Sequence, residues 1–430
     1  MSRDRRPLVG LLTAGTISRT GSVMSLVALP WFTLVLTGSA ARTGMVAFAE
    51  MLPFVLACAL GGPLIDRLGA RRVSIVADLG SAVAVAAIPL LHRAGGLGFG
   101  TLVGLVAVTG MLRGFSDSAK RVMFPKTVEA AGTPMTRATS LNDGLSRLAT
   151  LLGAPLAGLL VAVFDAPTVL LIDAATFAVG AVLLALTLSA RRFGGPEPTA
   201  HAADGEPGSS AADGEPASAA ADREPYLTAL RAGLRFLRGE PLVHGMMLLL
   251  FVTNLADAAY NSVLLPVWAR EVAGSSAALG FLTGSFALGA VLGNAVFTVV
   301  APRVPRFAVF AVGFLIAGAP RFVGLALLDP LWAIYLVSFT AGVSIAAINP
   351  ILGAVSFERI PEHLRARVLG LTQAAAWAGI PLGGLLGGAA VNGMGLPAAL
   401  LLFGSAYLVV TLLPFVLPVW RELDRQPSPA

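Results

Sequence analysis

Charge is scarce in this chain. Charged residues make up 13% of the 430 residues, whereas roughly 25% is usual in soluble globular proteins, and 56% of the residues are hydrophobic. So much apolar surface is tolerated only where a lipid bilayer replaces water as the solvent. The composition therefore predicts a membrane protein.

Cysteine and histidine are also rare. The single cysteine, Cys58, lies in an apolar run, which excludes an intrachain disulfide and a cysteine-rich metal site. No histidine lies well inside an apolar run, so a buried histidine relay is not expected. The soluble segments hold no Ser/His/Asp set, no paired catalytic carboxylates and no nucleotide-binding loop. We therefore expect no enzyme, no metal and no bound cofactor, and the basic residues form no soluble face for nucleic acid.

Long apolar runs are abundant. The bilayer core of about 30 Å takes roughly 20 apolar residues per helix, and residues 98–112 show none of the alternation of a β-barrel strand. The runs predict an all-α membrane protein with twelve transmembrane helices. Their approximate ranges are 8–36, 43–65, 73–91, 97–119, 139–163, 167–190, 243–269, 277–300, 307–328, 331–356, 368–391 and 396–418.

The basic residues are distributed unevenly between the two sets of connections. With both termini in the cytoplasm, 23 of the 30 Lys and Arg residues fall on the inner side, three on the outer side and four within spans. Such an excess in short inner loops follows the positive-inside rule. We therefore predict twelve spans with both termini cytoplasmic.

One segment differs in composition from the rest. Residues 194–224 are rich in Gly, Pro, Ala, Ser and acid, which predicts a flexible linker that does not fold alone. After it, residues 226–241 place leucines on one side of a helix and arginines on another, which predicts a helix that lies on the membrane surface. We thus divide the chain into residues 1–193, a linker at 194–241, and residues 242–430.

The two halves repeat each other. Residues 29–44 align with residues 265–280 at a shift of 236, with Leu, Pro, Gly, Ser, Ala and the final Gly in register. Residues 153–160 align with residues 379–386 at a shift of 226. Two six-helix bundles with a site at their interface describe one transporter plan.

One Asp and three Arg are concentrated between the second and third spans. This stretch resembles the signature of the major facilitator superfamily, Gly-x-Leu-x-Asp-Arg-x-Gly-Arg followed by Lys or Arg. The matching residues are Gly62, Leu64, Asp66, Arg67, Gly69 and Arg71, and Arg72 follows. Residues 41–53, 171–177 and 230–241 resemble the drug:proton antiporter branch, which includes macrolide and siderophore exporters.

The resemblance implies a cytoplasmic gate in this turn. In the family the signature Asp lies at the N-terminus of span 11, where the positive helix end favours an anion. Asp66 would take that place here, and Arg67 or Arg71 would reach Asp117 at the inner end of span 4. The alternative is that Arg67, Arg71 and Arg72 only set the topology. The copy of Asp66 in the second half is Pro302.

Several ionisable residues lie within spans, where each needs a partner or a task. Arg19 and Asp257 occupy near-equivalent places in the two halves, so we expect them to face each other across a central cavity, as a titrating or a structural pair. Glu50, taken as unpaired, suits a proton carrier, or it simply hydrates at the cavity mouth. Arg113 partly matches the antiporters' arginine near the proton site.

Other charged residues receive structural interpretations. Asp143 and Arg147 are four residues apart and are expected to neutralise each other on span 5. Arg321, with Asp329, and Asp173 are expected at the periphery, through snorkelling or helix packing.

Small residues and prolines recur on spans 5 and 11. They permit close helix contact and bending, so they predict hinges, although tight packing alone would also explain the glycines. The hinge candidates are Gly153, Pro155, Gly158, Gly379, Pro381 and Gly383.

Together these features predict a monomeric secondary transporter in a bacterial cytoplasmic membrane. It would export a small amphipathic molecule, such as a drug, antibiotic or siderophore-like compound, in exchange for protons. The alternatives are an importer of a nutrient or peptide, and a transport-inactive sensor or assembly protein.

Overall fold

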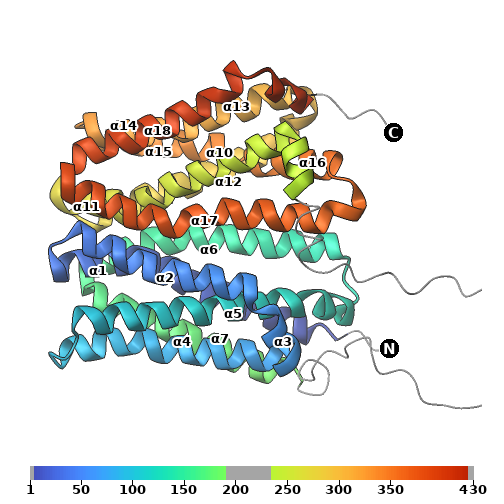
Figure 1. Cartoon of the computed structure of the whole chain (residues 1–430). Helices are drawn as coiled ribbons and strands as arrows, with labels where there is room; N and C mark the ends of the chain where they lie inside the picture. The colour runs from blue at the N-terminus through green and yellow to red at the C-terminus, as the bar shows by residue number, and fades with distance from the viewer. Residues whose placement is uncertain (1–3, 190–233, 425–430) are drawn as a thin grey trace, which may run out of the picture.

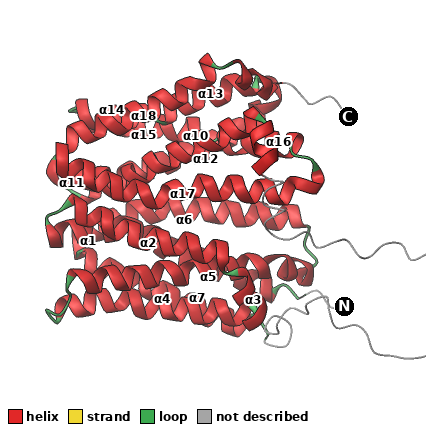
Figure 2. Cartoon of the chain, in the orientation of Figure 1, coloured by secondary structure: helices red, strands yellow, loops and turns green. Residues whose placement is uncertain are grey.

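The chain forms a bundle of long helices. The computed structural model describes residues 4–189 and 234–424, and Figures 1 and 2 show only helices and loops in this part of the chain. In these residues twelve spans, each made of one to three consecutive helices, are long and apolar enough to cross a membrane, as the sequence predicts. Residues 190–233, with the linker and most of the interfacial helix expected from the sequence, lie outside the described residues.

The first half contains seven helices. They are α1 (Arg6–Thr37), α2 (Ala40–Leu60), α3 (Gly62–Leu68), α4 (Ala70–Arg93), α5 (Phe99–Ala131), α6 (Met135–Phe164) and α7 (Ala166–Thr187). Six of them span, and the short α3 joins α2 to α4. Within this half α1 packs against α6 and α7, α2 against α5, and α4 against α5 and α7.

The second half contains six spans, three of them interrupted. Its elements are α10 (Pro241–Ala259), η1 (Tyr260–Leu264), α11 (Leu265–Glu271), α12 (Ser276–Val300), η2 (Ala301–Arg303), α13 (Arg306–Ala317), α14 (Ala319–Leu327), α15 (Leu331–Ile345), α16 (Ile348–Arg359), α17 (Glu362–Met394), α18 (Leu396–Val416) and η3 (Pro418–Asp424). One span joins α10, η1 and α11, a second joins α13 and α14, and a third joins α15 and α16.

Two of these interruptions have local causes. The π-helix η1 lies just before Pro266, whose ring nitrogen donates no hydrogen bond, and such π segments are frequent near functional sites. Gly318 separates α13 from α14, and a Cβ atom built there would overlap the ring of Tyr407. Both breaks lie beside Arg321, which is buried in the second half.

Both ends of the described chain lie at the same end of the bundle. There α1 begins and η3 ends (Figure 1), and we call this end the terminal face and the other the opposite face. At the terminal face Arg359 at the end of α16 donates hydrogen bonds to Glu240 and Glu422. Burial opposes the charge of Arg359, but these two hydrogen bonds outweigh it and raise the pKa of the guanidinium. The contact holds η3 against the start of α10.

The two halves meet through glycines that the internal repeat relates. A Cβ atom on Gly44 of α2 would lie 3.1 Å from Cα of Gly388 and 3.1 Å from the carbonyl carbon of Gly384, both on α17. A Cβ atom on Gly158 of α6 would lie 2.7 Å from Cα of Gly280 on α12. Gly280 is the copy of Gly44, and Gly384 is the copy of Gly158. The α2–α17 and α6–α12 crossings are therefore equivalent.

Candidate functional site

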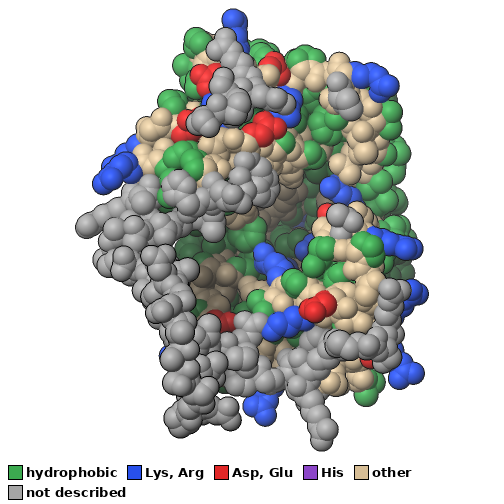
Figure 3. All heavy atoms as spheres, turned by 90° about the vertical axis from the view of Figure 1, so that its right-hand side faces the viewer, with side chains coloured by type: hydrophobic (Ala, Val, Ile, Leu, Met, Phe, Trp, Pro, Cys, Tyr) green, Lys and Arg blue, Asp and Glu red, His purple; other side chains and the backbone are tan. Residues whose placement is uncertain are grey.

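A cavity of about 800 Å³ lies between the halves. Figure 3 views the molecule from the terminal face and shows the hollow, with hydrophobic and basic side chains around it. Ligand pockets for drug-sized molecules are commonly about 300 to 1,000 Å³, so this cavity is large enough for a molecule of that class. The glycine crossings lie near the starts of α2 and α12 and near the ends of α6 and α17, so the halves are in contact nearer the opposite face, whereas the hollow opens at the terminal face (Figure 3).

The cavity wall is asymmetric. The second half contributes neutral residues from η1, α12 and α17, namely Asn261, Ser262, Leu279, Thr283 and Trp377. All the ionisable residues that line it, among those described, come from the first half, and they are Arg19, Glu50, Asp78, Arg113, Asp117, Lys120 and Arg121. Charge recognition in this cavity therefore belongs to the first half.

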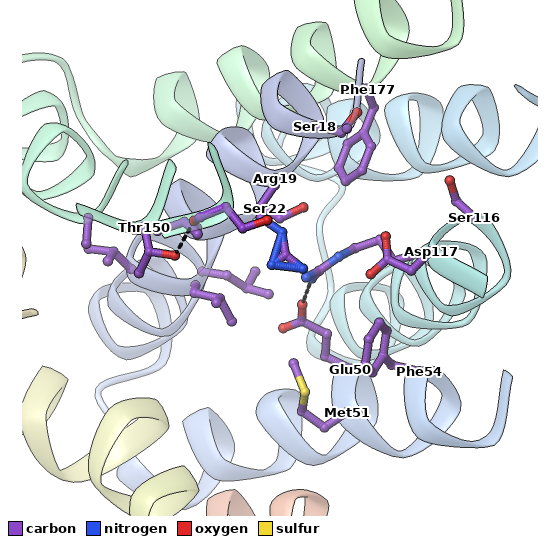
Figure 4. A pocket seen from close by; sticks show the side chains of 18 of the residues that line it. Ser18, Arg19, Ser22, Glu50, Met51, Phe54, Ser116, Asp117, Thr150 and Phe177 are labelled. Atoms are coloured by element: carbon purple, nitrogen blue, oxygen red, sulfur yellow. Dashed lines mark hydrogen bonds and ion pairs between the residues drawn. The ribbon is translucent and has the colours of Figure 1, made fainter. Parts of the chain in front are cut away.

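Glu50 and Arg113 form an ion pair in the cavity wall. The Glu50 side chain extends from α2 into the cavity (Figure 4), and its Oε1 lies 2.5 Å from Arg113 Nη1 on α5. The exposed fractions of the two side chains are 9% and 13%, so the pair is largely screened from water while one side faces the cavity. The assumption that Glu50 is unpaired is wrong, because α2 packs directly on α5 and brings the two charges together.

A second ion pair lies deeper in the same wall, and the sequence interpretation missed it. Asp78 of α4 is fully buried, accepts a hydrogen bond of 2.5 Å from Ser116 Oγ, and lies 2.9 Å from Lys120 Nζ. An acid within the apolar run of α4 was a signal that could have identified it.

Asp257 pairs within the second half. Its Oδ1 lies 2.5 Å from Arg321 Nη2, and both residues line a separate pocket of about 120 Å³. The Arg321 guanidinium also lies 5.1 Å from the Tyr260 ring and 5.0 Å from the Phe286 ring, at cation–π range. The expectation that Arg321 lies at the periphery with Asp329 is therefore wrong, and Asp257 does not contact Arg19.

Arg19 extends from α1 into the cavity (Figure 4). It is exposed, and among the described residues it has no ion pair or hydrogen bond through its side chain. The predicted contact with Asp257 is absent from this structure because Arg321 already neutralises that carboxylate.

The remaining charged residues of the spans take other positions. Asp143 and Arg147 are both exposed on α6 and form no ion pair with each other. Asp173 is buried in α7 rather than turned to lipid, and it accepts a hydrogen bond from Ser25 of α1. Helix packing, one of the two readings expected for Asp173, is what the structure shows.

The signature residues lie at the terminal face, in α3 and the start of α4. Gly69 has φ +85°, a conformation that favours glycine, and it ends α3 so that α4 can begin at Ala70. Arg71 donates hydrogen bonds of 2.7 Å to the Leu188 carbonyl and 2.9 Å to the Ala185 carbonyl at the end of α7. There the guanidinium complements the negative helix end.

The predicted gate contacts are not made in this open arrangement. Gly62, Asp66, Arg67 and Arg72 are all exposed. Among the described residues, Asp66 has no hydrogen bond or ion pair, and Asp117 lines the cavity without an ion pair to Arg67 or Arg71. The gate itself remains a prediction for a state in which the terminal face is closed.

The hinge candidates lie in two continuous helices. On α6, a Cβ atom on Gly153 would meet Val23 of α1 at 3.1 Å, and Pro155 packs against Gly284 of the other half. On α17, Gly379 and Gly383 pack against α10, and Pro381 lies between them. These glycines permit close packing, and the bending predicted at the two prolines remains a prediction.

The opposite face carries a polar contact between the halves. Arg270 of α11 donates a hydrogen bond from Nη1 to the Leu34 carbonyl in the last turn of α1. The two positions are 236 residues apart, which is the shift of the internal repeat. Equivalent positions of two related halves meet only near the axis that relates them, so this contact marks that axis.

Comparison with known proteins gives related chains over the full length. The family model described as Major Facilitator Superfamily matches residues 11–256, and the one described as transmembrane secretion effector matches residues 214–430. The multidrug efflux pump Tap of Mycobacterium tuberculosis is 29% identical over 429 residues, covering 99% of this chain and 96% of the pump. Tap of Mycolicibacterium fortuitum is also 29% identical and covers 99% of both chains.

Solved structures share the fold at lower identity. A variant of the nucleoside transporter NupG superposes with a TM-score of 0.75 at 15% identity, covering 95% of this chain and 99% of that one. A bacterial homologue of the human lysosomal transporter Spinster, in an inward-facing and unoccupied conformation, superposes with a TM-score of 0.67 at 16% identity over 100% of both chains. At such identities the likeness extends to the fold alone.

Proposed function

The chain belongs to the Major Facilitator Superfamily, and from that premise we propose that it exports small amphipathic molecules from a bacterial cytoplasm in exchange for protons. It is a multi-pass secondary transporter and not an enzyme. The proposal concerns the direction of transport, the coupling ion and the class of cargo. We also propose that the protein acts as a monomer with both termini in the cytoplasm.

The observation that carries the proposal is the cavity with its Glu50–Arg113 pair. A space of about 800 Å³ with apolar residues such as Met51 and Phe54 beside polar ones suits an amphipathic drug-sized molecule. The full-length similarity to pumps named for multidrug efflux supports export of such molecules.

The Glu50–Arg113 pair offers a route to proton coupling. A proton on the Glu50 carboxyl removes its charge and weakens its attraction to Arg113. The freed guanidinium then needs another anion or water, which changes the balance between the open and closed arrangements of the halves. Proton binding and release at Glu50 would thus bias the two-state motion that carries cargo across.

The signature turn supplies the proposed gate on the cytoplasmic side. Closing the terminal face would bring Asp66 to the N-terminus of α17, where the helix dipole favours a carboxylate. The helices α6 and α17, which contact the other half, would bend at Pro155 and Pro381 during this movement. Arg270 at the opposite face would release Leu34 as that face opens.

Transport into inverted membrane vesicles tests the proposal. A neutral fluorescent amphipathic dye, N-phenyl-1-naphthylamine, is added outside vesicles that carry the protein and whose lumen is more acidic than the medium. We expect uptake that needs the gradient and stops when nigericin dissipates it, with Glu50→Gln as the inactive comparison. Movement driven in the reverse sense would indicate an importer. A panel of dyes and drugs with no gradient-driven movement of any member would contradict transport and favour the sensor alternative.

A further inference from the structure

Arg19 is the one arginine of the cavity wall that has no partner for its guanidinium among the described residues. Arg113 pairs with Glu50, and Arg121 donates hydrogen bonds to the Asp117 carbonyl and to Cys58 Sγ. Arg19 extends into the space of the cavity (Figure 4) and is exposed there because the cavity is open at the terminal face.

The carboxylates that could have neutralised Arg19 are already used. Glu50 holds Arg113, Asp78 holds Lys120, and Asp257 of the second half holds Arg321. Asp117 is the remaining acid in the cavity wall, and it forms no ion pair with Arg19 in this structure. Counting every ionisable group in the wall, four are cationic and three are acidic, so the wall carries one net positive charge.

The surroundings of Arg19 define the shape of a ligand. Ser22 follows it by one turn on α1, so a hydroxyl group is available near the guanidinium (Figure 4), whereas the hydroxyl of Thr150 on α6, which also lines the cavity, donates its hydrogen to the Ser146 carbonyl. Met51, Phe54 and Trp377 supply apolar surface to the same space. The combination fits a molecule with an apolar, aromatic body and one acidic group.

Closure of the terminal face would change the solvation of the unpaired Arg19 guanidinium. In the open state water solvates Arg19, but a closed cavity removes most of that water. An unpaired charge near the bilayer centre is costly, so closing an empty cavity is opposed. A ligand anion beside Arg19 removes that opposition, because a guanidinium and an acidic oxygen form strong charge-assisted hydrogen bonds.

We propose that Arg19 is the binding site for an acidic group of the cargo, so that the preferred cargo is an amphipathic molecule carrying a carboxylate or a comparable acidic oxygen. This inference rests on the proposed function only in calling the ligand cargo. The binding preference itself is a property of the cavity and is measured without transport.

Binding of matched probe pairs tests it. The full-length protein in lipid nanodiscs is titrated with dansylglycine and its neutral amide, and with two further aromatic carboxylate and amide pairs of larger size, at pH 7. Energy transfer from tryptophan to the dansyl group reports binding, and a decrease of the signal in Trp377→Phe, which leaves the other four tryptophans of the chain in place, locates the probe near the cavity wall. We expect at least one acid to bind about tenfold more tightly than its amide, as for a hydrogen bond between charged groups.

Variants decide whether Arg19 causes the preference. Arg19→Gln should bind acid and amide equally, whereas Arg19→Lys should keep part of the preference and Arg303→Gln, outside the cavity, all of it. Thermal unfolding of each variant confirms that it is folded. If no acid is preferred to its amide in the parent, or if Arg19→Gln keeps the preference, the inference is wrong. An Asp117→Asn variant that alone creates the preference would show that Asp117 normally occupies Arg19 and would also overturn it.

The two proposals fail separately. Acid preference without any gradient-driven movement in vesicles would leave the binding site standing and contradict the transport proposal. Gradient-driven export of the neutral dye by a protein that binds acids and amides equally would do the reverse.

Discussion

Each half of the molecule holds an ion pair between two of its helices, and in both pairs the closest atoms are 2.5 Å apart. Their surroundings differ. The Glu50–Arg113 pair of the first half faces the large cavity, whereas Arg321 of the second half is 5% exposed and lies at cation–π range of two aromatic rings. The carboxylate of Asp257 is 31% exposed, but it faces the small pocket of about 120 Å³, so the first pair is the one that borders the large cavity.

The comparison shows which properties the repeat keeps. Gly44 and Gly158 retain glycines as their copies, because any side chain there would prevent the halves from meeting. Charge is not kept in the same way: the second half contributes neutral residues to the cavity wall. The contacts between the halves thus follow the two-fold repeat, whereas the charged residues of the cavity wall all belong to the first half. Four substitutions test this difference between the halves.

The largest effect is expected for Glu50→Gln. If the first pair carries the proton, gradient-driven export falls by about tenfold or more, equivalent to about 1.4 kcal/mol or more in the barrier, and the remaining activity loses its dependence on pH. Uptake into vesicles, measured for the parent and the variant from pH 5.5 to 8.5, tests this expectation. Normal, pH-dependent export by a well-expressed variant would remove Glu50 from the coupling step.

Asp257→Asn should act mainly on stability. It leaves the Arg321 guanidinium buried without its carboxylate, a change that costs about 3 kcal/mol in typical buried pairs. The midpoint of thermal unfolding in nanodiscs should fall, and the double variant Asp257→Leu with Arg321→Met should recover part of the loss. An Asp257→Asn variant that unfolds like the parent but no longer responds to the proton gradient would reverse the roles of the two halves.

Asp66→Asn tests an element that the repeat does not duplicate, since Pro302 stands at the equivalent position. A carboxylate at a helix N-terminus contributes about 1 kcal/mol, so export should fall about fivefold with the amount of folded protein unchanged. Initial export rates, normalised to purified protein, measure it. Parent-like rates would indicate that the signature charges serve topology alone.

The smallest effect is expected for Arg270→Gln, whose equivalent in the first half is Leu34. Losing a cation from the last turn of α1 costs about 0.5 kcal/mol, which shifts the balance toward an open opposite face about twofold. Spin-label distances between the ends of α1 and α11 report this balance. Arg303→Gln, at the other end of the second half, serves as the control and should leave the distances as they are.

Much of the fold was predictable because hydropathy and charge bias act locally. The twelve spans follow from apolar runs, and the 236-residue repeat correctly related Gly44 to Gly280. Helix lengths were less predictable. Hydropathy ends the fourth span near residue 119, but α5 continues to Ala131, since its polar last turns stand outside the apolar run.

The partners of the buried charges were harder to predict. Glu50 and Arg113 were each identified, but they are 63 residues apart and meet only because α2 packs on α5. Arg321 was assigned to Asp329 from nearness in sequence, whereas its carboxylate comes from a different helix of the same half. Partner choice depends on which helix faces touch, and one sequence does not specify that.

If the halves rock as we propose, the two glycine crossings would be the points about which they turn. They lie on opposite sides of the axis marked by Arg270 and Leu34, and the helices that provide Gly158 and Gly384 each contain a proline a few residues away. Because the two halves are in close contact at two matched points near the opposite face, a small rotation about these points would become a large displacement at the terminal face. A side chain added at one crossing, for example by Gly280→Ala, would separate α12 from α6 but leave the α2–α17 crossing as it is. The two halves would then tilt unequally about the axis, and the rotation would change in direction as well as in size.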